Sequence, residues 1–527
     1  MPSKFPSLAT LLEASARSRN YPFAERAALW EERLAMHLKD LEAVMAAPEA
    51  GDMLALPARA KTEVVQPGRS AEVPARSADI AFASAAQVAA AVHAGTVSPV
   101  EVAEAILPRI EQHAHLNAFI CVRPEQVRQD AKALAERIAK GEDPGPLAGV
   151  PVAVKDLMYV RGYPRTCGTR AMDPVVAEHD AEAVARLRNA GALIVGMANL
   201  HELAYGVTSA NVHFGPVNNP AAPGHLPGGS SGGSGAAVAA GLAAIAVGTD
   251  TGGSIRIPAA CCGVVGFKAS YDAVSREGVW PLAWTLDHIG PLARSVGDAA
   301  LGFEIMAGLP AGCVADKRID RPRFVRPAPF FFDHVDDAVR TRIEAVFAQL
   351  TGEGAQIEER WIEGIEYAPA VQFLTLSTEA CQANWELLTQ RPEGLAPDVR
   401  LRMEVGQFIG GIDYVKAQRL RRWLRYNMLA TLKGADAFIL PTLPVSIPRQ
   451  GTTTLQIAGR TLPVPAALTR LTGPFNFSGL PAVSIPCGRD VNGAPVGLQI
   501  VGRAGADATV LAAARWCEQI LGEGRSQ

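Results

Sequence analysis

The stretch that decides the fold is HLPGGSSGGSGAAVAAG, residues 225–241, in which six glycines and three serines give way to alanine. Segments rich in glycine and serine are most often flexible linkers. This one runs directly into AAVAAGLAAIAVG, residues 236–248, which is typical of a buried, closely packed helix. The flanking sequence therefore favours a structured role for the glycines.

Two familiar glycine-rich motifs fit this stretch poorly. A phosphate-binding loop needs a lysine directly after its last glycine, and none follows here. Residues 229–233 formally match the GxSxG elbow of esterases, which requires a hydrophobic strand before the serine. The preceding residues, GPVNNPAAPGHLPGG (215–229), indicate a loop instead. We interpret the elbow match as accidental.

A second glycine-rich stretch, GTDTGGSIRIPAACCG (248–263), indicates a catalytic role. Successive Gly-Gly-Ser amides can form a backbone nest for a negatively charged oxygen, and Ser254 at its end is a candidate nucleophile. A candidate base is Lys155, which closes the apolar strand VPVAVKD (150–156). Burial lowers the pKa of a lysine, and a neutral lysine can accept a proton from a hydroxyl.

These motifs together resemble the amidase signature hydrolases, whose hallmark is a Ser–Ser–Lys triad that uses no histidine and no metal. The family pattern GGSSGG[SG] is followed 24 residues after its first serine by the nucleophile in D-x-GGS-[IV]-R-x-P. Ser230 and Ser254 match that spacing (254 − 230 = 24), and Lys155 matches the lysine of G-[IV]-P-[IV]-x-[VL]-K-D. The resemblance covers about residues 79 to 520. One departure is Lys268-Ala269-Ser270, where the family usually has Lys-Pro-Thr.

The resemblance implies a fold and a set of site residues. The expected fold is α/β, with α/β/α layers around a mixed, mostly parallel central β-sheet. Ser230 is expected behind a cis peptide bond to Gly229, bridging Lys155 to Ser254. The backbone amides of the nest are expected to hold the oxyanion, while neighbouring side chains hold the glycine-rich turn. For Arg256 the alternative is binding of a substrate carboxylate. The nest residues are Thr251, Gly252, Gly253 and Ser254, and the supporting residues are Ser231, Asp250 and Arg256.

Strand-like and helix-like segments alternate along the chain, which supports the α/β assignment. We predict a helical and extended N-terminal extension at 1–78, a catalytic domain at 79–520 and a short tail at 521–527. In the extension, Leu34, Leu38, Leu41 and Met45 follow a helical period. Within the catalytic domain, Ser98-Pro99-Val100-Glu101 predicts a capped helix start.

The composition of the chain limits the classes of molecule that it is expected to bind. The chain has 527 residues and a formal net charge of −3, so no basic surplus points to nucleic acid. No apolar run reaches the roughly 20 residues of a membrane span. The eight cysteines form no CxxC motif and no Cys/His cluster, and we expect a reduced, cytoplasmic protein without metal or cofactor. A homodimer is left open.

Other polar and aromatic residues near the motifs carry two interpretations each. Ser231 and Ser234 are either catalytic or, as we expect for loop serines, bond local backbone. The histidines are expected to be structural. Tyr205 and Arg165 are candidate pocket-wall residues. Two tryptophans and a phenylalanine run either line an apolar acyl or aryl pocket or belong to the core. The histidines are His201, His213, His225 and His288, and the aromatic residues are Trp280, Trp284 and Phe330 to Phe332.

The expected function is hydrolysis of a C–N bond, other than a peptide bond, in a small amide, carbamate or urethane-like substrate through an acyl-enzyme. Two alternatives remain. One is the A subunit of a glutamine-dependent tRNA amidotransferase, which would need partner subunits. The other is a catalytically silent scaffold.

Overall fold

The computed structural model describes residues 42–47, 62 and 80–523. Most of the predicted extension, including Leu34, Leu38 and Leu41, lies outside the described residues. Glu42 to Ala46 are helical, Val44 is buried, and Lys416 Nζ donates a hydrogen bond to the carbonyl oxygen of Met45. The predicted domain boundaries at residues 78 and 520 stay predictions. The last helix runs past the second of these positions and ends at Glu523.

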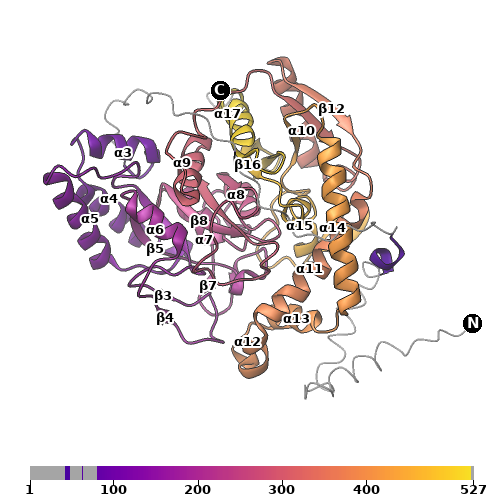
Figure 1. Cartoon of the computed structure of the whole chain (residues 1–527), viewed down its shortest axis with the longest axis horizontal. Helices are drawn as coiled ribbons and strands as arrows, with labels where there is room; N and C mark the ends of the chain where they lie inside the picture. The colour runs from indigo at the N-terminus through magenta and orange to yellow at the C-terminus, as the bar shows by residue number, and fades with distance from the viewer. Residues whose placement is uncertain (1–41, 48–61, 63–79, 524–527) are drawn as a thin grey trace, which may run out of the picture.

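An eleven-stranded mixed sheet forms the centre of the described chain (Figure 1). Parallel pairing is confined to two groups, β5–β2–β8 and β13–β11–β12, and the other neighbours pair antiparallel. The strands, in spatial order, are β1 (Phe119–Cys121), β5 (Leu193–Ala198), β2 (Pro151–Lys155), β8 (Ile245–Asp250), β10 (His288–Ala293), β9 (Val265–Lys268), β16 (Ala482–Arg489), β17 (Pro495–Val501), β13 (Ala437–Pro441), β11 (Arg323–Pro327) and β12 (Gln356–Arg360).

Helices cover the sheet on both faces, which confirms the predicted α/β/α layers. Gly302 packs over Ile245 of β8 on one face, and Gly248 of the same strand lies against Ile255 on the other. Because side chains alternate along a strand, residues three positions apart point to opposite faces. The first face carries α9 (Val296–Ala307), α10 (Asp337–Gly352) and α17 (Asp507–Glu523), and the second carries α7 (Gly232–Ala239) and α8 (Arg256–Cys262).

Further helices flank this sandwich. One group lies beside β5 and β2, and a second forms the orange assembly at the right and bottom of Figure 1. The first group is α3 (Ala85–His93), α4 (Pro99–Gln112), α5 (Pro124–Ala139) and α6 (Glu182–Asn189). The second is α11 (Ala368–Ala383), α12 (Trp385–Gln390), α13 (Pro397–Gly406) and α14 (Gly411–Thr431), with the short α15 (Val464–Thr469) and α16 (Pro474–Phe477) nearby.

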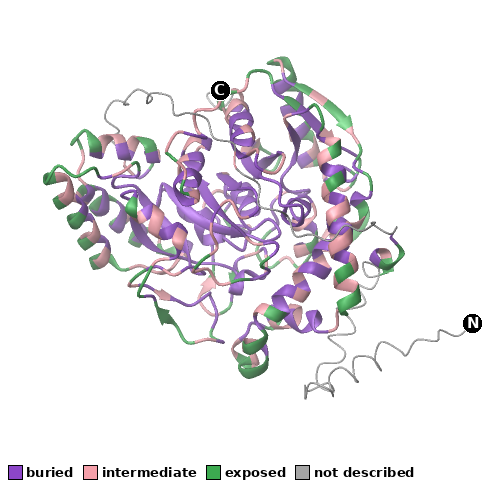
Figure 2. Cartoon of the chain, viewed as in Figure 1, coloured by how far each residue is buried: buried purple, intermediate pink, exposed green. Residues whose placement is uncertain are grey.

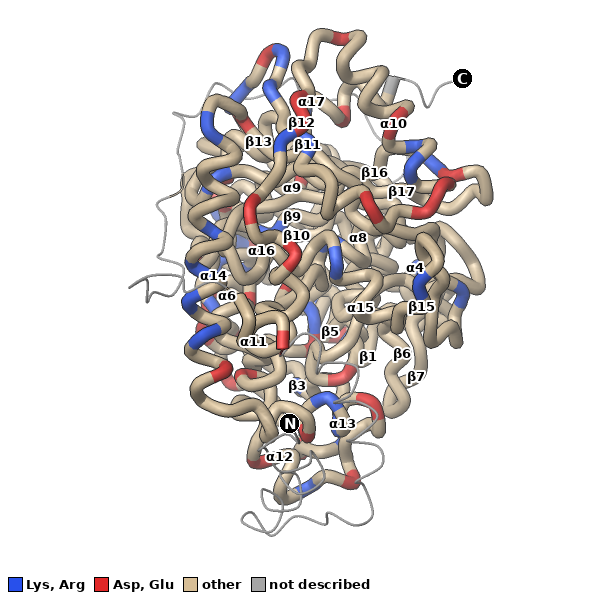
Figure 3. Tube along the Cα trace, turned by 90° about the vertical axis from the view of Figure 1, so that its right-hand side faces the viewer, with Lys and Arg blue, Asp and Glu red and all other residues tan. Residues whose placement is uncertain are grey.

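Three two-stranded sheets lie outside the central sheet: β3 (Pro164–Arg165) with β4 (Val175–Val176), β6 (Ala210–Asn211) with β7 (Gly215–Pro216), and β14 (Thr454–Ile457) with β15 (Arg460–Pro463). The capped start of α4 is confirmed, because Ser98 and Glu101 bond each other's backbone amides. Charged residues of both signs are interspersed over the outer helices, and the central strands carry few (Figure 3).

One predicted element is wrong. Residues 236–248 were expected to form a single buried helix, but α7 ends at Ala239 and β8 begins at Ile245. Gly241 has a φ of +66° and ends the helical path, since a left-handed residue breaks the α-helical repeat. The run is nevertheless buried along nearly its whole length (Figure 2), which is why its helical and strand halves look alike in sequence.

Candidate active site

Lys155 lies at the end of β2, fully buried, and its amine contacts three hydroxyl groups. Its Nζ is 2.7 Å from Ser230 Oγ, 2.9 Å from Ser231 Oγ and 2.7 Å from Thr249 Oγ1. Burial lowers the pKa of Lys155 from 10.5 to about 7, and the negative charges of Asp250 and Asp287 act in the opposite direction. The amine is therefore poised to exchange a proton with a hydroxyl near neutral pH.

Ser230 is held between two segments by its backbone. The Gly229–Ser230 peptide bond is cis, as the resemblance implied. The carbonyl oxygen of Ser230 accepts hydrogen bonds from the His201 amide (3.0 Å) and from Ser209 Oγ (3.3 Å). These contacts fix the backbone beneath the hydroxyl that meets Lys155.

The glycines of the 225–241 stretch allow close backbone contacts. A Cβ on Gly229 would lie 2.8 Å from the carbonyl carbon of Val207, and one on Gly233 would lie 2.3 Å from the carbonyl oxygen of Asn199. Real side chains do not tolerate such distances. The glycine content thus follows from packing against neighbouring backbone, and a linker role is excluded.

Ser254 follows β8, in a loop that Asp250 holds in place. The Gly253 amide donates to Asp250 Oδ1 (2.8 Å) and the Ile255 amide to Asp250 Oδ2 (3.1 Å). The Gly253 amide, expected to bind the oxyanion, is therefore already engaged in this structure. The predicted bridge between Ser230 and Ser254 is not formed in this structure, because within the described residues no hydrogen bond joins their hydroxyl groups. The segments meet instead through the Ser231 amide and the Ser254 carbonyl, 3.3 Å apart.

The carbonyl groups of this loop are turned toward protein partners. Gln372 Nε2 donates to the Thr251 carbonyl (3.0 Å), and Thr472 Oγ1 donates to the Gly252 carbonyl (2.6 Å). The amides of Thr251, Gly252 and Ser254 have no partner among the described residues. Three unpaired amides beside a serine are suited to binding a negatively charged oxygen.

Arg256 supports the loop from below. Its guanidinium is fully buried and pairs with Asp250 through Nε (3.0 Å) and Nη2 (2.9 Å). Nη1 donates to the Thr472 carbonyl and to Gln499 Oε1, and Nη2 also donates to Asn476 Oδ1. Although burial alone would raise the pKa of Asp250, the Arg256 charge holds it well below its usual range. The pair serves as structural support, and none of these groups is directed at a ligand.

The remaining polar candidates are two serines and four histidines, and most of them make hydrogen bonds that hold the structure. Ser234 Oγ donates to the Val247 carbonyl (3.1 Å), as expected. Ser231 does more than bond local backbone, because it contacts Lys155 directly. His201 lies between Asp398 (Nε2 to Oδ2, 3.3 Å) and Thr208 (3.2 Å), and burial lowers its pKa. His213, His225 and His288 bond Glu202, the Pro223 carbonyl and the Leu286 carbonyl.

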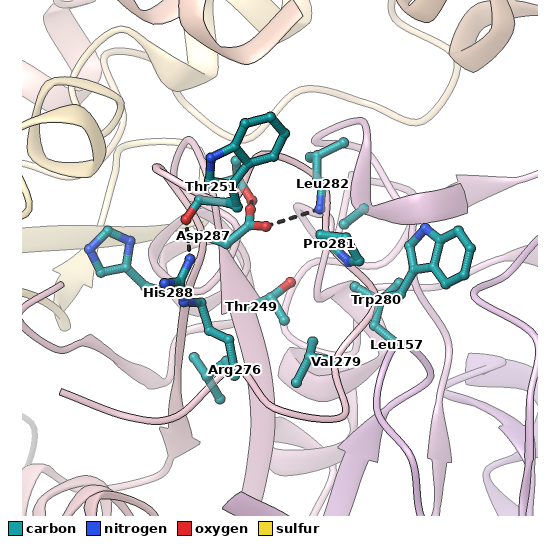
Figure 4. A pocket seen from close by; sticks show the side chains of 13 residues that line it. Leu157, Thr249, Thr251, Arg276, Val279, Trp280, Pro281, Leu282, Asp287 and His288 are labelled. Carbon is teal, nitrogen blue, oxygen red and sulfur yellow. Dashed lines mark hydrogen bonds between the residues drawn. The ribbon is translucent and has the colours of Figure 1, made fainter. Parts of the chain in front are cut away.

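Two cavities adjoin the site. The larger has a volume of about 640 Å³ and is bordered by Ser254 and Gly252, with walls mainly from α11, α13 and the 461–474 segment. The smaller, about 270 Å³, is bordered by Thr249 and contains Trp280 and Trp284 (Figure 4). Ala204, Thr251 and Leu282 line both cavities.

Of the two candidate pocket-wall residues, one lines a cavity directly and the other supports an aromatic side chain. Tyr205 lines the larger cavity, whereas the Arg165 guanidinium stacks on Tyr159, 4.0 Å from its ring centre, and supports Trp280. The phenylalanine run is core, with Phe331 stacked on Phe475 at 5.5 Å.

Sequence reasoning missed four residues that complete the site: Thr249, Gln372, Thr472 and Asn476. Thr249 stands inside the glycine-rich stretch itself, so its position was the one available signal. The other three come from segments more than 110 residues downstream, where no motif marks them.

Metal-binding clusters and membrane spans are both absent from the part of the chain that the structure describes. No group of three or more His, Cys, Asp or Glu side chains among these residues is arranged to hold a metal ion. No described helix is long and apolar enough to cross a membrane.

Comparison with known proteins places the chain in a family. The Amidase family profile matches residues 101–511. The chain is 35% identical over 480 residues to the A subunit of the glutamyl-tRNA(Gln) amidotransferase of Carboxydothermus hydrogenoformans, covering 84% of this chain and 98% of that protein. It is 36% identical over 408 residues to the AtzE subunit of the 1-carboxybiuret hydrolase of Pseudomonas sp. strain ADP, covering 73% and 87%.

A solved structure described as a crystal structure of amidase matches with a TM-score of 0.79 and 38% identity, over 83% of this chain and 99% of that one. The chain therefore belongs to the amidase signature family, whose enzymes hydrolyse C–N bonds.

Proposed function

We propose that this protein hydrolyses an amide C–N bond through Lys155, Ser230 and Ser254. The observation that carries the proposal is the Lys155 amine, which is buried, has a pKa near 7 and lies 2.7 Å from Ser230 Oγ. Ser254 borders the larger cavity, where a carbonyl carbon can reach it. Burial of a lysine whose amine contacts only hydroxyl groups lowers the stability of the folded protein. A role in proton transfer would account for the presence of such a lysine. This argues against the silent scaffold.

The reaction begins when neutral Lys155 accepts a proton from Ser230, and Ser230 accepts one from Ser254 as the Ser254 oxygen attacks the carbonyl carbon. The link between the serines forms when substrate binds, since catalytic hydrogen bonds often tighten only in the complex. The oxyanion is held by the amides of Thr251, Gly252 and Ser254.

Collapse of this intermediate breaks the C–N bond, and Ser230 gives its proton to the leaving nitrogen. Lys155 then returns its proton to Ser230, which restores the neutral amine and the Ser230 hydroxyl. The product is an acyl ester of Ser254. Water, deprotonated by the same relay, then attacks the ester and releases the acid, which restores the Ser254 hydroxyl.

The larger cavity favours a small amide or carbamate whose acyl side is apolar. Phe373, Leu376, Val405 and Leu462 are among its apolar lining residues. Apolar walls with a few polar groups near the reacting atoms are typical of small-molecule sites. A cytoplasmic location is part of the proposal, because all eight cysteines are described and none forms a disulfide.

A second candidate is the A subunit of a glutamine-dependent tRNA amidotransferase. The amidotransferase subunits among the relatives support it more strongly than they support urethane cleavage. In that case glutamine is the amide, and partner subunits are required. The AtzE relative is likewise named as one subunit of its hydrolase.

The test is turnover by the purified chain alone. Release of ammonia or amine is measured with glutamine, and with a panel of primary amides, anilides, ureas and carbamates. Hydrolysis of apolar amides at least tenfold faster than glutamine supports the main proposal. A preference for glutamine that rises when partner subunits are added supports the second candidate. No turnover of any amide by the chain alone overturns the main proposal, and no turnover of glutamine with partner subunits present overturns the second.

A further inference from the structure

We propose that the smaller cavity binds the amine half of the substrate, so that the enzyme acts on N-substituted amides bearing an aromatic or compact apolar group on nitrogen. The inference rests on the proposed function and names its substrate class. It is carried by the position of this cavity relative to the catalytic groups.

The two cavities approach the reaction centre from different sides. Ser254 borders the larger one, and Thr249 borders the smaller. Thr249 Oγ1 is 2.7 Å from Lys155 Nζ, which is itself 2.7 Å from Ser230 Oγ. The smaller cavity therefore opens beside the proton relay, and the larger beside the nucleophile.

This arrangement orients an amide. The carbonyl carbon must face Ser254, and its nitrogen must face the group that returns the proton, which is Ser230. The acyl substituent then extends into the larger cavity. The nitrogen substituent passes Thr251, Ala204 and Leu282, which line both cavities, and enters the smaller one.

The dimensions and lining of the smaller cavity suit one ring. An apolar protein cavity of about 150 Å³ is sufficient to bind benzene, and this cavity measures about 270 Å³. Val279 and Trp280 form part of its wall (Figure 4), and Trp280 Nε1 is anchored to Asn384 Oδ1 at 2.9 Å. Trp284 is 41% exposed. An anchored indole gives the ring a rigid stacking surface.

Most donor and acceptor atoms of the charged groups at the smaller cavity bond protein partners, and the exception among the described residues is the buried Nε of Arg276. The Asp287 carboxylate accepts hydrogen bonds from Thr251 Oγ1 (2.6 Å) and from the amides of Leu282 (3.0 Å) and Ala283 (3.0 Å). Arg276 donates to the Trp284 carbonyl and to Asp272 Oδ1. Selection in this cavity therefore depends on shape and apolar contact, which favours a neutral aryl or alkyl group over a charged one.

The test compares two substrates with one acyl group, hexanamide and its anilide. Val279→Phe narrows the smaller cavity, and Leu376→Phe in the wall of the larger cavity is the matched control. We expect Val279→Phe to lower kcat/KM for the anilide at least about tenfold while changing hexanamide by less than about twofold. Leu376→Phe should change both substrates by the same factor. Equal losses on both substrates in Val279→Phe, with native circular dichroism, overturn the inference.

A binding measurement separates this inference from the proposed function. Aniline is titrated into Ser254→Ala, with and without Val279→Phe, and tryptophan fluorescence is followed. Saturable quenching that Val279→Phe weakens at least about fivefold supports the cavity assignment even when no amide is hydrolysed. Absence of saturable quenching overturns it even when hexanamide is a good substrate.

Discussion

The proposed catalytic centre and the wall of the larger cavity are built on opposite principles. In the centre, Lys155 and its three hydroxyl partners are buried, and these four side chains are joined by hydrogen bonds through the lysine amine. In the wall, Phe373 and Leu376 line the cavity with apolar side chains. The centre is built from the ends of β2 and β8, the loop after β8 and the segment before α7, whereas the wall comes mainly from helices outside the sheet and from the 461–474 segment.

The difference means that bond cleavage and substrate choice depend on different parts of the molecule. A hydrogen-bonded cluster tolerates no displacement, because each lost partner leaves another buried polar group unsatisfied. An apolar wall tolerates replacement and loses mainly contact area. Substitutions in the centre should therefore abolish turnover of every substrate, and substitutions in the wall should change the ranking of substrates.

The largest effect is expected from Ser254→Ala. It removes the attacking oxygen, and losses for the nucleophile of such a unit are on the order of 10⁴–10⁶ in kcat. The melting temperature should stay close to that of the wild type, because no side-chain hydrogen bond of Ser254 is present in the described structure. Turnover is measured with the best amide of the panel. Substantial labelling of Ser254→Ala by a fluorophosphonate would show that another serine is the nucleophile.

The next effect concerns Lys155 and pH. Only the neutral amine accepts a proton, and the folded pKa is about 7. Activity of the wild type should therefore fall about tenfold per unit as the pH drops below 7, and level off above it. Lys155→Arg stays charged throughout and should lose at least about a thousandfold of kcat/KM from pH 5 to 10.

Circular dichroism controls for folding of the Lys155 variant. Lys155→Ala serves as a second control, because it removes the amine without adding a larger charged group. A Lys155→Arg protein that keeps a tenth of wild-type activity would assign the lysine an electrostatic role and place the base elsewhere.

How far the sequence predicted these two regions follows from the range of their contacts. Lys155, Ser230 and Ser254 stand in short motifs that lie within 100 residues of one another in the sequence, so their proximity was predictable. The catalytic support from Gln372 and Thr472 depends on α11 and on the segment before α16. No local pattern encodes that docking, because it is set by how distant helices pack on the loop.

The fold shows the same division. The strand β2 was predicted almost to the residue, since short apolar runs bounded by glycine or proline are typical of buried strands. The boundary between α7 and β8 was missed, because an element buried on every side has no periodic pattern. The engaged Gly253 amide was also beyond the sequence, since the side chain of Asp250 competes for it.

A moderate effect is expected in the wall. Phe373→Ala enlarges the larger cavity and removes apolar contact with the acyl group. We expect kcat/KM for a hexanoyl amide to fall about 10- to 200-fold relative to the corresponding acetyl amide, as for other losses of apolar pocket contact. Both substrates are measured at one pH with the same amine. Equal losses on the two acyl groups would mean that Phe373 acts on the centre and that the regions are not separable.

The smallest effect is expected at His201, which stands between the two regions. Its backbone amide binds the Ser230 carbonyl, and its ring binds Asp398 of α13. Were His201 the base, its replacement would cost as much as that of Lys155. Its ring nitrogens contact Asp398 and Thr208, however, and burial lowers its pKa, so it stays neutral and structural.

His201→Gln keeps a polar side chain of similar reach and leaves the backbone bond to Ser230 in place. We expect kcat/KM to fall less than about tenfold, with the pH midpoint near 7 unchanged, because that midpoint belongs to Lys155. The pH profile of kcat/KM from pH 5 to 10 decides the matter. A thousandfold loss together with a vanished pH midpoint would transfer the role of base from Lys155 to His201.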